Sequence, residues 1–417
     1  SRRRARPRER IAVGEERLGA SGVLGVTRCD AAQGATGWGD HPMREDWGME
    51  NEHVQDVVVV GAGIVGAATA RTLAEAGRDV LLLERFERGH DRGSSHGATR
   101  IFRQGYTDDH HVQLTTRALA AWRALEAASG RRLLTLNGAV DHGDPEMLAA
   151  IADAFDRNGI AHERLAVADA EARWPGLRFD REVLHHASAG RIASAEAIEA
   201  LLDLAEAAGA TLRFDVRVSD VRLDGELVVI GTPHGDVTAR SLVVAAGSWV
   251  PDLLGALLAD AGEPLPEVVV TQEQPAHFPI VGGRPESDAA WPSFVHYRSG
   301  SGVGSGGTPG VYGLLTPGEG VKVGLHGTGP RVDPDERDFT AEPERLADLV
   351  RYVDEWIPGV DASAPAPISC VYDTSPDEEF VIGHHGPIVY ATGFSGHGFK
   401  FGPVLGELLA EHVLPRG

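Results

Sequence analysis

The hexapeptide GAGIVG at residues 61–66 is the feature that most constrains what this chain can fold into. It follows the apolar run VQDVVVV and opens the small-residue segment AATARTLAEAG, so the pattern predicts a strand, a tight turn and a helix. Glycines at this spacing permit the turn, close approach of the backbone to a pyrophosphate, and close packing of helix on strand. We therefore predict a dinucleotide site, with a glycine-rich turn that binds no nucleotide as the alternative; its candidate residues are Gly61, Gly63, Ile64, Val65 and Gly66.

A carboxylate at the end of the next predicted strand supports the nucleotide interpretation. Glu84 closes the run RDVLLLE, 23 residues after Gly61. A carboxylate at that position can accept hydrogen bonds from both hydroxyls of a ribose. The valine and leucine runs do not alternate with polar residues, which is typical of a parallel sheet covered on both faces.

Two later segments favour FAD over NAD as the nucleotide. The sequence GSSHGATR at residues 93–100 is a second loop rich in glycine and serine, and Ser248 follows the strand-like run LVVAAG. From these regions we add further candidate cofactor-binding residues, which are Ser94, Ser95, Val218, Gly247 and Trp249.

Charge and cysteine content exclude several classes of protein. Lys and Arg number 39 against 61 Asp and Glu, and a surface with a net charge of −22 repels phosphate backbones and anionic lipid. Two cysteines are too few for a disulfide scaffold. The apolar run from Val57 to Ala70 spans 14 residues, fewer than the roughly 18 that a transmembrane helix needs. We expect no nucleic-acid partner and no membrane span.

We also expect no bound metal. The histidine pairs at 110–111, 185–186 and 384–385 have no further metal ligands at a useful spacing. They are therefore interpreted as surface or loop residues.

The 417 residues divide into a tail and two discontinuous domains of an α/β (α+β) fold. Residues 1–52 begin SRRRARPRER and lack a periodic apolar pattern, so we expect a disordered tail or a mis-assigned start. Nucleotide-binding features recur at the start, middle and end of the remainder. We place the cofactor domain at 53–134, 192–265 and 372–417, and the substrate domain at 135–191 and 266–371.

Four segments resemble a known family. GAGIVG, GSSHGATRIFRQGY, SCVYDTSPDEEFVIG and ATGFSGHGFKFGP are similar to the flavoprotein amine oxidases of the monomeric sarcosine oxidase type, which include N-methyltryptophan oxidase and pipecolate oxidase. The likeness runs from about residue 54 to the C-terminus. It implies a Rossmann-like FAD-binding domain and a substrate domain built on an antiparallel sheet.

The resemblance implies roles around the flavin. Cys370 matches the cysteine that forms a thioether to the flavin 8α-methyl group, with an inert buried thiol as the alternative. Arg103 and Lys400 match the pair that binds the substrate carboxylate, one as a fork and the other as a point charge. Arg100 matches an arginine that lies close to the flavin, on the face opposite to the substrate. The segment that contains Lys400 adds cofactor contacts from Gly396, Gly398, Phe399 and Lys400 itself.

The segment GVKVGLH at residues 320–326 resembles the G-x-K-x-G-x-H strand of the family. There the lysine, here Lys322, lies near flavin N5 and promotes the reaction with oxygen, and the histidine, here His326, lies beside the bound amine. Strand alternation places both side chains on one face, and an outward-facing lysine on an edge strand is the alternative. Tyr312 and Tyr372 match tyrosines that line the substrate pocket.

Departures from the family pattern concern the substrate. Val295 stands where sarcosine oxidases commonly carry methionine, and the segment SGSGVGSGGTPG at 299–310 is absent from compact members. Ala98 replaces an acidic residue that often precedes the Thr-Arg pair. These changes leave the residues for amine oxidation in place but argue against sarcosine itself.

The resemblance therefore implies a monomeric, cytoplasmic, FAD-dependent oxidase. Its substrate is expected to be a secondary or cyclic α-amino acid, which is oxidised to an imine while oxygen is reduced to hydrogen peroxide. A dehydrogenase that uses another electron acceptor, and a flavin-binding protein without catalysis, are the alternatives.

Overall fold

The predicted strand, turn and helix are present and begin a sheet of eight strands. The computed structural model describes residues 54–298 and 310–414. Strand β1 (Val54–Val60) leads through the turn into α1 (Ile64–Glu75), and β2 (Val80–Leu83) lies parallel to β1. The last four residues of β1 are buried, as its unbroken apolar run predicts.

Segments far apart in the sequence combine in this first sheet. Its parallel strands are β1, β2, β9 (Thr211–Arg213), β12 (Gly235–Val244) and β21 (Ile388–Thr392). The long strand β12 pairs along its first half with an antiparallel neighbour and along its last residues with β21. Three antiparallel strands complete the sheet: β10 (Asp220–Asp224), β11 (Leu227–Thr232) and β20 (Val381–His385).

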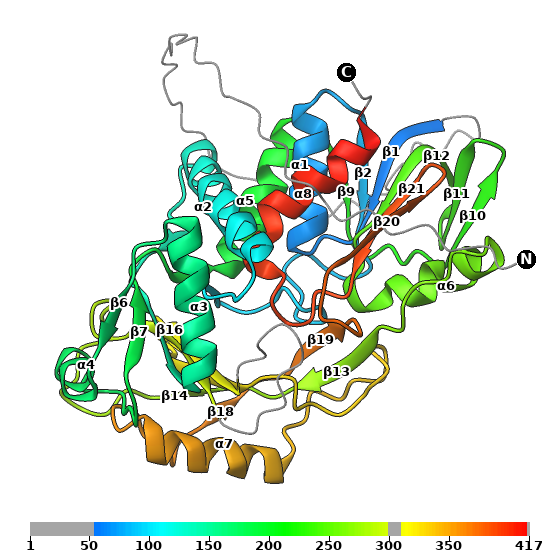
Figure 1. Ribbon diagram of the computed structural model, residues 1–417. Coiled ribbons are helices and arrows are strands. Elements are labelled where there is room, and N and C mark those ends of the chain that lie inside the picture. Colours follow the sequence, from blue (N-terminus) through cyan, green and yellow to red (C-terminus); the bar gives the residue numbers. More distant parts are fainter. Residues whose placement is uncertain (1–53, 299–309, 415–417) are drawn as a thin grey trace, which may run out of the picture. The chain divides into compact units, whose positions relative to one another are not determined.

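Four helices pack together beside this sheet (Figure 1). They are α1, α2 (Asp109–Ser129), α5 (Ser194–Ala207) and α8 (Gly402–Val413). Small residues bring α1 and α8 close, because a Cβ on Gly406 would lie 2.5 Å from that of Ala68. A further helix, α6 (Val250–Asp260), follows the short 3-10 turn η1 (Gly247–Trp249).

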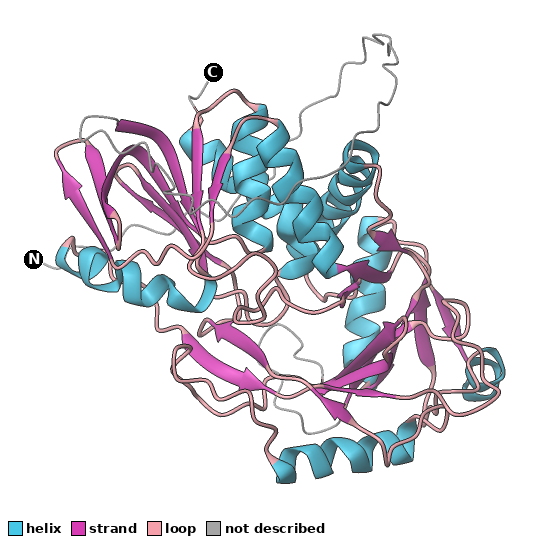
Figure 2. Cartoon of the chain, turned by 180° about the vertical axis from the view of Figure 1, so that it is seen from behind, coloured by secondary structure: helices cyan, strands magenta, loops and turns pink. Residues whose placement is uncertain are grey.

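A second sheet of eight strands has a core of its own. In spatial order its strands are β18 (Ala366–Pro367), β14 (Ala276–Phe278), β17 (Gly320–Leu325), β16 (Val311–Thr316), β15 (Ser293–Tyr297), β5 (Ala139–Gly143), β7 (Val183–His186) and β6 (Glu163–Leu165). All pairs are antiparallel except β15 with β5. The helices that pack near this sheet are α3 (Pro145–Asn158), α4 (Val167–Arg173) and α7 (Pro343–Trp356) (Figure 2).

Two further sheets are small. One joins β3 (Thr99–Phe102), β8 (Gly190–Ala193) and β4 (Leu134–Thr135), and the other pairs β13 (Val269–Glu273) with β19 (Cys370–Thr374). The hydroxyl groups of Thr99 and Thr316 are 2.7 Å apart and link β3 to β16 of the second large sheet. The mixed α/β class predicted from the sequence is confirmed, whereas the exact domain boundaries stay a prediction.

Some expectations lie outside the described residues or were wrong. The predicted tail and nearly all of the segment at 299–310 fall outside the described ranges. The interpretation of the histidine pairs was wrong for three members: His111, His185 and His186 are buried, in α2 and β7. The pattern misled because these polar residues occupy inward positions of regular elements. The other three, His110, His384 and His385, are at least partly exposed.

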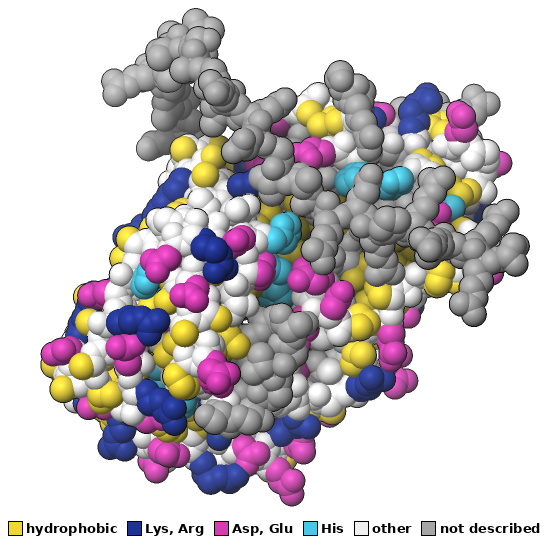
Figure 3. All heavy atoms as spheres, viewed as in Figure 1, with side chains coloured by type: hydrophobic (Ala, Val, Ile, Leu, Met, Phe, Trp, Pro, Cys, Tyr) yellow, Lys and Arg dark blue, Asp and Glu magenta, His cyan; other side chains and the backbone are white. Residues whose placement is uncertain are grey.

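The described surface carries charges of both signs. On the face in Figure 3, acidic and basic side chains of the described residues are interspersed. Among the described helices, none is both long and apolar enough to cross a bilayer.

The close packing at the turn after β1 predicts that one added methyl group destabilises the fold. A Cβ on Gly66 would lie 1.9 Å from the carbonyl oxygen of Gly61, so Gly66→Ala forces the backbone apart. We expect it to lower the free energy of unfolding by about 3 kcal/mol, measured by urea denaturation. The matched control is Gly255→Ala in α6, where nothing lies within 4 Å of the added methyl group; it should be neutral or stabilising by up to about 1 kcal/mol. Equal effects of the two variants would contradict this account of the turn.

Candidate active site

The turn between β1 and α1 presents backbone N–H groups to two predicted side chains. Gly61 has φ +104°, and a Cβ there would lie 2.6 Å from a carbonyl oxygen just after β12. The N–H of Ala62 donates to Glu84 Oε2 at 2.7 Å, and that of Ile64 donates to Ser95 Oγ at 3.1 Å. Glu84 and Ser95 therefore stand at the start of α1, where helix N–H groups favour an anionic ligand.

Glu84 is held as a carboxylate in spite of its burial. Burial opposes the charge, but His90 at 3.4 Å and the N–H groups of Ala62 and Phe86 outweigh it and lower the pKa of Glu84. An ionised carboxylate in this position is an acceptor for ribose hydroxyls.

One cavity of about 590 Å³ brings nearly all the predicted site residues together. This volume is typical of sites for cofactors and small ligands. The predicted residues that line it are Gly61, Gly63, Ile64, Val65, Glu84, Ser94, Ser95, Arg100, Arg103, Val218, Gly247, Trp249, Tyr312, Lys322, His326, Cys370, Tyr372, Gly396, Gly398, Phe399 and Lys400. Gly66 does not line the cavity, since it faces the backbone of Gly61, and it contributes by the packing of α1 instead of by ligand contact.

Arg103 is buried but keeps one edge of its guanidinium group available. Its Nη1 donates to the carbonyl oxygen of Gly105 and to the hydroxyl of Tyr297 at 3.2 Å. Within the described ranges Nε and Nη2 have no protein acceptor, and Arg103 lines the cavity. A guanidinium edge of this kind suits a carboxylate held by two hydrogen bonds.

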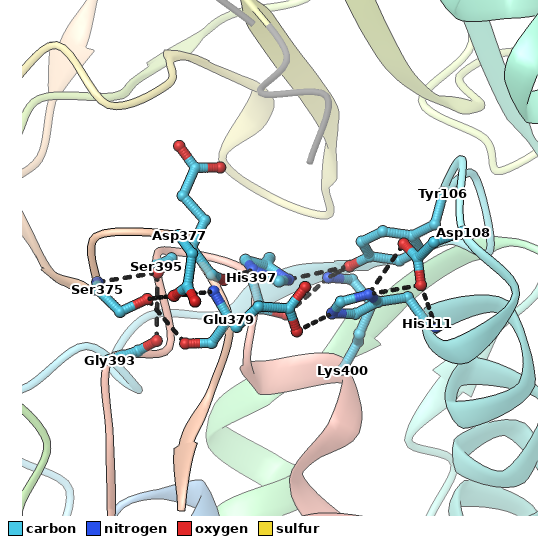
Figure 4. Close-up of polar contacts among 11 residues, drawn as sticks. Tyr106, Asp108, His111, Ser375, Asp377, Glu379, Gly393, Ser395, His397 and Lys400 are labelled. Carbon is cyan, nitrogen blue, oxygen red and sulfur yellow. Dashed lines mark hydrogen bonds and ion pairs between the residues drawn. The ribbon is translucent and has the colours of Figure 1, made fainter. Parts of the chain in front are cut away.

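Lys400 is held in place by neutral oxygens (Figure 4). Its Nζ donates to the Tyr106 hydroxyl at 2.8 Å and to the His397 carbonyl oxygen at 2.7 Å. The Tyr106 hydroxyl lies 3.2 Å from His397 Nδ1, and His397 Nε2 lies 3.2 Å from the carbonyl oxygen of Glu378. Because a carbonyl can only accept, Nε2 carries the proton and Nδ1 accepts from Tyr106. Burial, with Arg103 nearby, lowers the pKa of Lys400 well below its ordinary value.

Lys322 faces the cavity from the interior of the second large sheet. It lies in β17 between β14 and β16, so the alternative of an outward-facing lysine on an edge strand was wrong. It makes no hydrogen bond to another described side chain. Burial and the charge of Arg100 lower the pKa of Lys322 to about 7. Lys322 and Lys400 are the two lysines of the whole chain, so both ammonium groups belong to this cavity.

Tyr372 lies beside His326, and glycines make room for it and for Tyr312. The hydroxyl of Tyr372 lies 3.5 Å from His326 Nδ1. Burial, with Arg103 and Lys400 nearby, lowers the pKa of His326 to about 4, so the imidazole is neutral at physiological pH. A Cβ on Gly324 would lie 2.6 Å from the Tyr312 ring, and one on Gly396 would lie 2.3 Å from the Tyr372 ring. The glycines of both motifs thus make room for the two tyrosines.

Arg100 and Cys370 line the same cavity. Arg100 donates to the carbonyl oxygens of Thr99, Ser94 and His96, and its guanidinium group lies 5.6 Å from the centre of the Phe399 ring. Cys370, buried at the start of β19, lines the cavity with them.

Sequence reasoning missed Tyr106 and His397, which hold Lys400. Both lie inside segments that the family resemblance singles out, GSSHGATRIFRQGY and ATGFSGHGFKFGP. The signal was therefore present, but only the fold shows that β3 and the residues before α8 bring the two side chains together.

A group with metal-ligand spacing lies among the described residues. His142, Asp180 and His296 have potential ligand atoms within 4.8 Å of one another. The two imidazole rings are stacked, with centroids 4.0 Å apart and planes 26° apart. His296 Nδ1 already lies 3.1 Å from the Tyr352 hydroxyl, and we assign no metal to this group.

The donor set fits FAD. The α1 turn suits a pyrophosphate, Glu84 suits a ribose, and Phe399 and Lys400, just before α8, line the cavity. A Cβ on Gly402 would lie 2.3 Å from Ile64 Cγ1, so α1 and α8 begin side by side and bring two positive helix ends together. Fold and site together define an FAD-dependent oxidoreductase.

Comparison with known proteins identifies the family. The family model described as FAD dependent oxidoreductase matches residues 56–412. The chain is 34% identical over 370 residues to monomeric sarcosine oxidase from Bacillus sp. (strain NS-129), covering 85% of this chain and 92% of that protein. It is 31% identical over 370 residues to N-methyl-L-tryptophan oxidase from Salmonella typhi, with 86% and 94% covered. The chain therefore belongs to the FAD dependent oxidoreductase family, and its predicted likeness to the sarcosine oxidase type is confirmed.

A solved structure supports the same conclusion. The open form of NikD, described as an unusual amino acid oxidase essential for nikkomycin biosynthesis, has a TM-score of 0.76 and 29% identity. The match covers 87% of this chain and 94% of that one. L-proline dehydrogenase from P. horikoshii, at 22% identity and a TM-score of 0.73, shares the fold.

Proposed function

We propose that this enzyme oxidises a secondary or cyclic α-amino acid to an imine and passes the electrons to oxygen. The observation that carries the proposal is the pair of buried basic side chains, Arg103 and Lys400, beside the neutral His326 in the cavity that contains the dinucleotide turn. The names of the relatives, sarcosine oxidase and N-methyl-L-tryptophan oxidase, support this substrate class. The substrate loses two electrons and two protons, oxygen becomes hydrogen peroxide, and water then hydrolyses the imine.

In this proposal the protein binds and orients the substrate. The free edge of Arg103 and the Nζ of Lys400 bind the carboxylate, which fixes the position of the neighbouring C–H and amine. Positioning of this kind contributes on the order of 7 kcal/mol or more at best. His326 and Tyr372 line the side of the amine, and because His326 is neutral it does not repel a protonated amine on entry. Bound FAD supplies the acceptor for the hydrogen that leaves carbon.

Anaerobic reduction of the flavin by candidate substrates tests the function. The bound flavin should lose its visible absorbance with N-methyl or cyclic α-amino acids such as N-methyltryptophan, proline or pipecolate. Admitting air should restore the colour with release of one hydrogen peroxide per flavin. A flavin that no secondary amino acid bleaches would sink the proposal.

We propose that Cys370 attaches the flavin covalently. Its place in the cavity, near both Lys322 and Tyr372, supports this. Denatured wild-type protein should keep a fluorescent flavin on a gel and a matching increase in intact mass, and Cys370→Ala should release both. A wild type whose flavin separates fully on denaturation would contradict the attachment.

We assign Lys322 to the reaction with oxygen, where a cation stabilises developing superoxide charge. Lys322→Met should slow reoxidation of the reduced flavin about 100-fold and change substrate reduction much less. Since burial and Arg100 hold the pKa of Lys322 at about 7, its charge is present at lower pH and lost as the pH rises. Stopped-flow reoxidation of the wild type should therefore slow above about pH 7, whereas reoxidation of the variant should be slow at every pH. Equal slowing of both half-reactions would reject the role.

We also propose that the enzyme works as a monomer, which the relatives named monomeric sarcosine oxidase support, and that it works in the cytoplasm.

A further inference from the structure

A buried polar chain lies behind Arg103, on the side away from its free edge. It consists of Tyr297 on β15, Asp141 on β5 and His186 on β7, three neighbouring strands of the second large sheet. Asp141 and His186 are fully buried and Tyr297 is nearly so. Groups this polar are retained in a sheet interior at a cost unless they are well paired.

Hydrogen bonds join Arg103 to Tyr297 and Tyr297 to Asp141. Arg103 Nη1 donates to the Tyr297 hydroxyl at 3.2 Å, and that hydroxyl donates to Asp141 Oδ1, also at 3.2 Å. Asp141 Oδ2 lies 3.6 Å from His186 Nδ1, which is too far for a hydrogen bond, and neither atom has a hydrogen-bond partner among the described residues. His186 Nε2 accepts the N–H of Gln104 at 3.4 Å, which leaves the proton on Nδ1, toward Asp141.

The charges in this chain complement one another. Burial raises the pKa of Asp141 to about 6, with Arg103 and Tyr297 acting against the rise, so the carboxyl is ionised at neutral pH. Burial and Arg103 lower the pKa of His186 to about 3, so the imidazole is neutral. The negative charge of Asp141 is thus linked to the buried guanidinium group of Arg103 through the Tyr297 hydroxyl.

Gly105 allows this close arrangement. A Cβ there would lie 2.9 Å from Arg103 Nη1 and 3.0 Å from Asp141 Oδ2. Its φ is not in the left-handed region, so a methyl group at this position acts as a wedge without straining the backbone.

We propose that Tyr297 and Asp141 are positioning residues for Arg103, which they hold so that its Nε and Nη2 face the substrate carboxylate. The inference rests on the proposed function, because it concerns the carboxylate that this function places on Arg103. Both Nη1 bonds are made behind the guanidinium group, and a pre-aligned fork loses less freedom when the carboxylate binds. Loss of the alignment should weaken carboxylate binding more than it slows the chemical step.

The test uses holoenzyme and acetate, a carboxylate that carries no amine. Acetate binding is followed by the change in flavin absorbance. Tyr297→Phe removes one oxygen and both of its hydrogen bonds, and should weaken acetate about tenfold. Gly105→Ala removes no polar group and should weaken acetate in the same direction. Tyr352→Phe is the matched control, since its buried hydroxyl bonds His296 at 3.1 Å and not Arg103; it should leave acetate affinity unchanged.

A double-mutant cycle separates positioning from a general structural effect. In Arg103→Lys, which lacks the planar fork, adding Tyr297→Phe should weaken acetate by less than twofold. With an oxidisable substrate, Tyr297→Phe should raise KM about tenfold and change the limiting rate of flavin reduction by less than threefold. Independent losses in the two variants, or an unchanged acetate affinity in Tyr297→Phe, would overturn the inference. Acetate binding needs no turnover, so it can be measured even if no amino acid reduces the flavin. In that case the expected double-mutant result would reject the proposed function and leave the positioning role of Tyr297 and Asp141 standing.

Discussion

The structure depends on positive charge that is buried at one place. Arg103, Lys322 and Lys400 are each less than a tenth exposed, in a chain whose net charge is −22. Burial disfavours an ammonium ion, and it lowers the pKa of both lysines. All other residues among the 39 Lys and Arg are arginines, and both lysines of the chain line this cavity. Such a site binds anions by local charge against the repulsion of the whole molecule.

The fold brings these charges together from elements that share no sheet. Arg103 follows β3 of a small sheet, Lys322 lies in the second large sheet, and Lys400 precedes α8 beside the first. Close approach of the elements requires residues without side chains at a few points. A methyl group on Gly61 or Gly324 would collide with backbone after β12 or with the Tyr312 ring. The same glycines that the motifs display are therefore the ones that packing demands.

Sequence motifs predicted residues that line the cavity, whereas the residues that hold Arg103 from the other side meet only in the folded structure. The turn at Gly61 and the carboxylate of Glu84 were predictable from their spacing in a strand–turn–helix pattern, whereas Lys322 was expected only from the resemblance of GVKVGLH to the family strand. Tyr297 and Asp141 were not readable, because they are 156 residues apart and meet only through the parallel pairing of β5 with β15. Likewise, His186 belongs to a sequence pair that resembles a polar loop, yet it lies inside β7.

The most direct test of the central claim uses the two lysines as reporters. Holoenzyme grown with lysine labelled with ¹³C at Cε should give two NMR signals, since the chain has Lys322 and Lys400 alone; Lys322→Met assigns them. Both should titrate well below the ordinary lysine value of about 10.4, and saturating acetate should raise the midpoint of Lys400, because a bound anion favours the charged form. Two signals that titrate near the ordinary value and ignore acetate would contradict a buried cationic site for the substrate carboxylate.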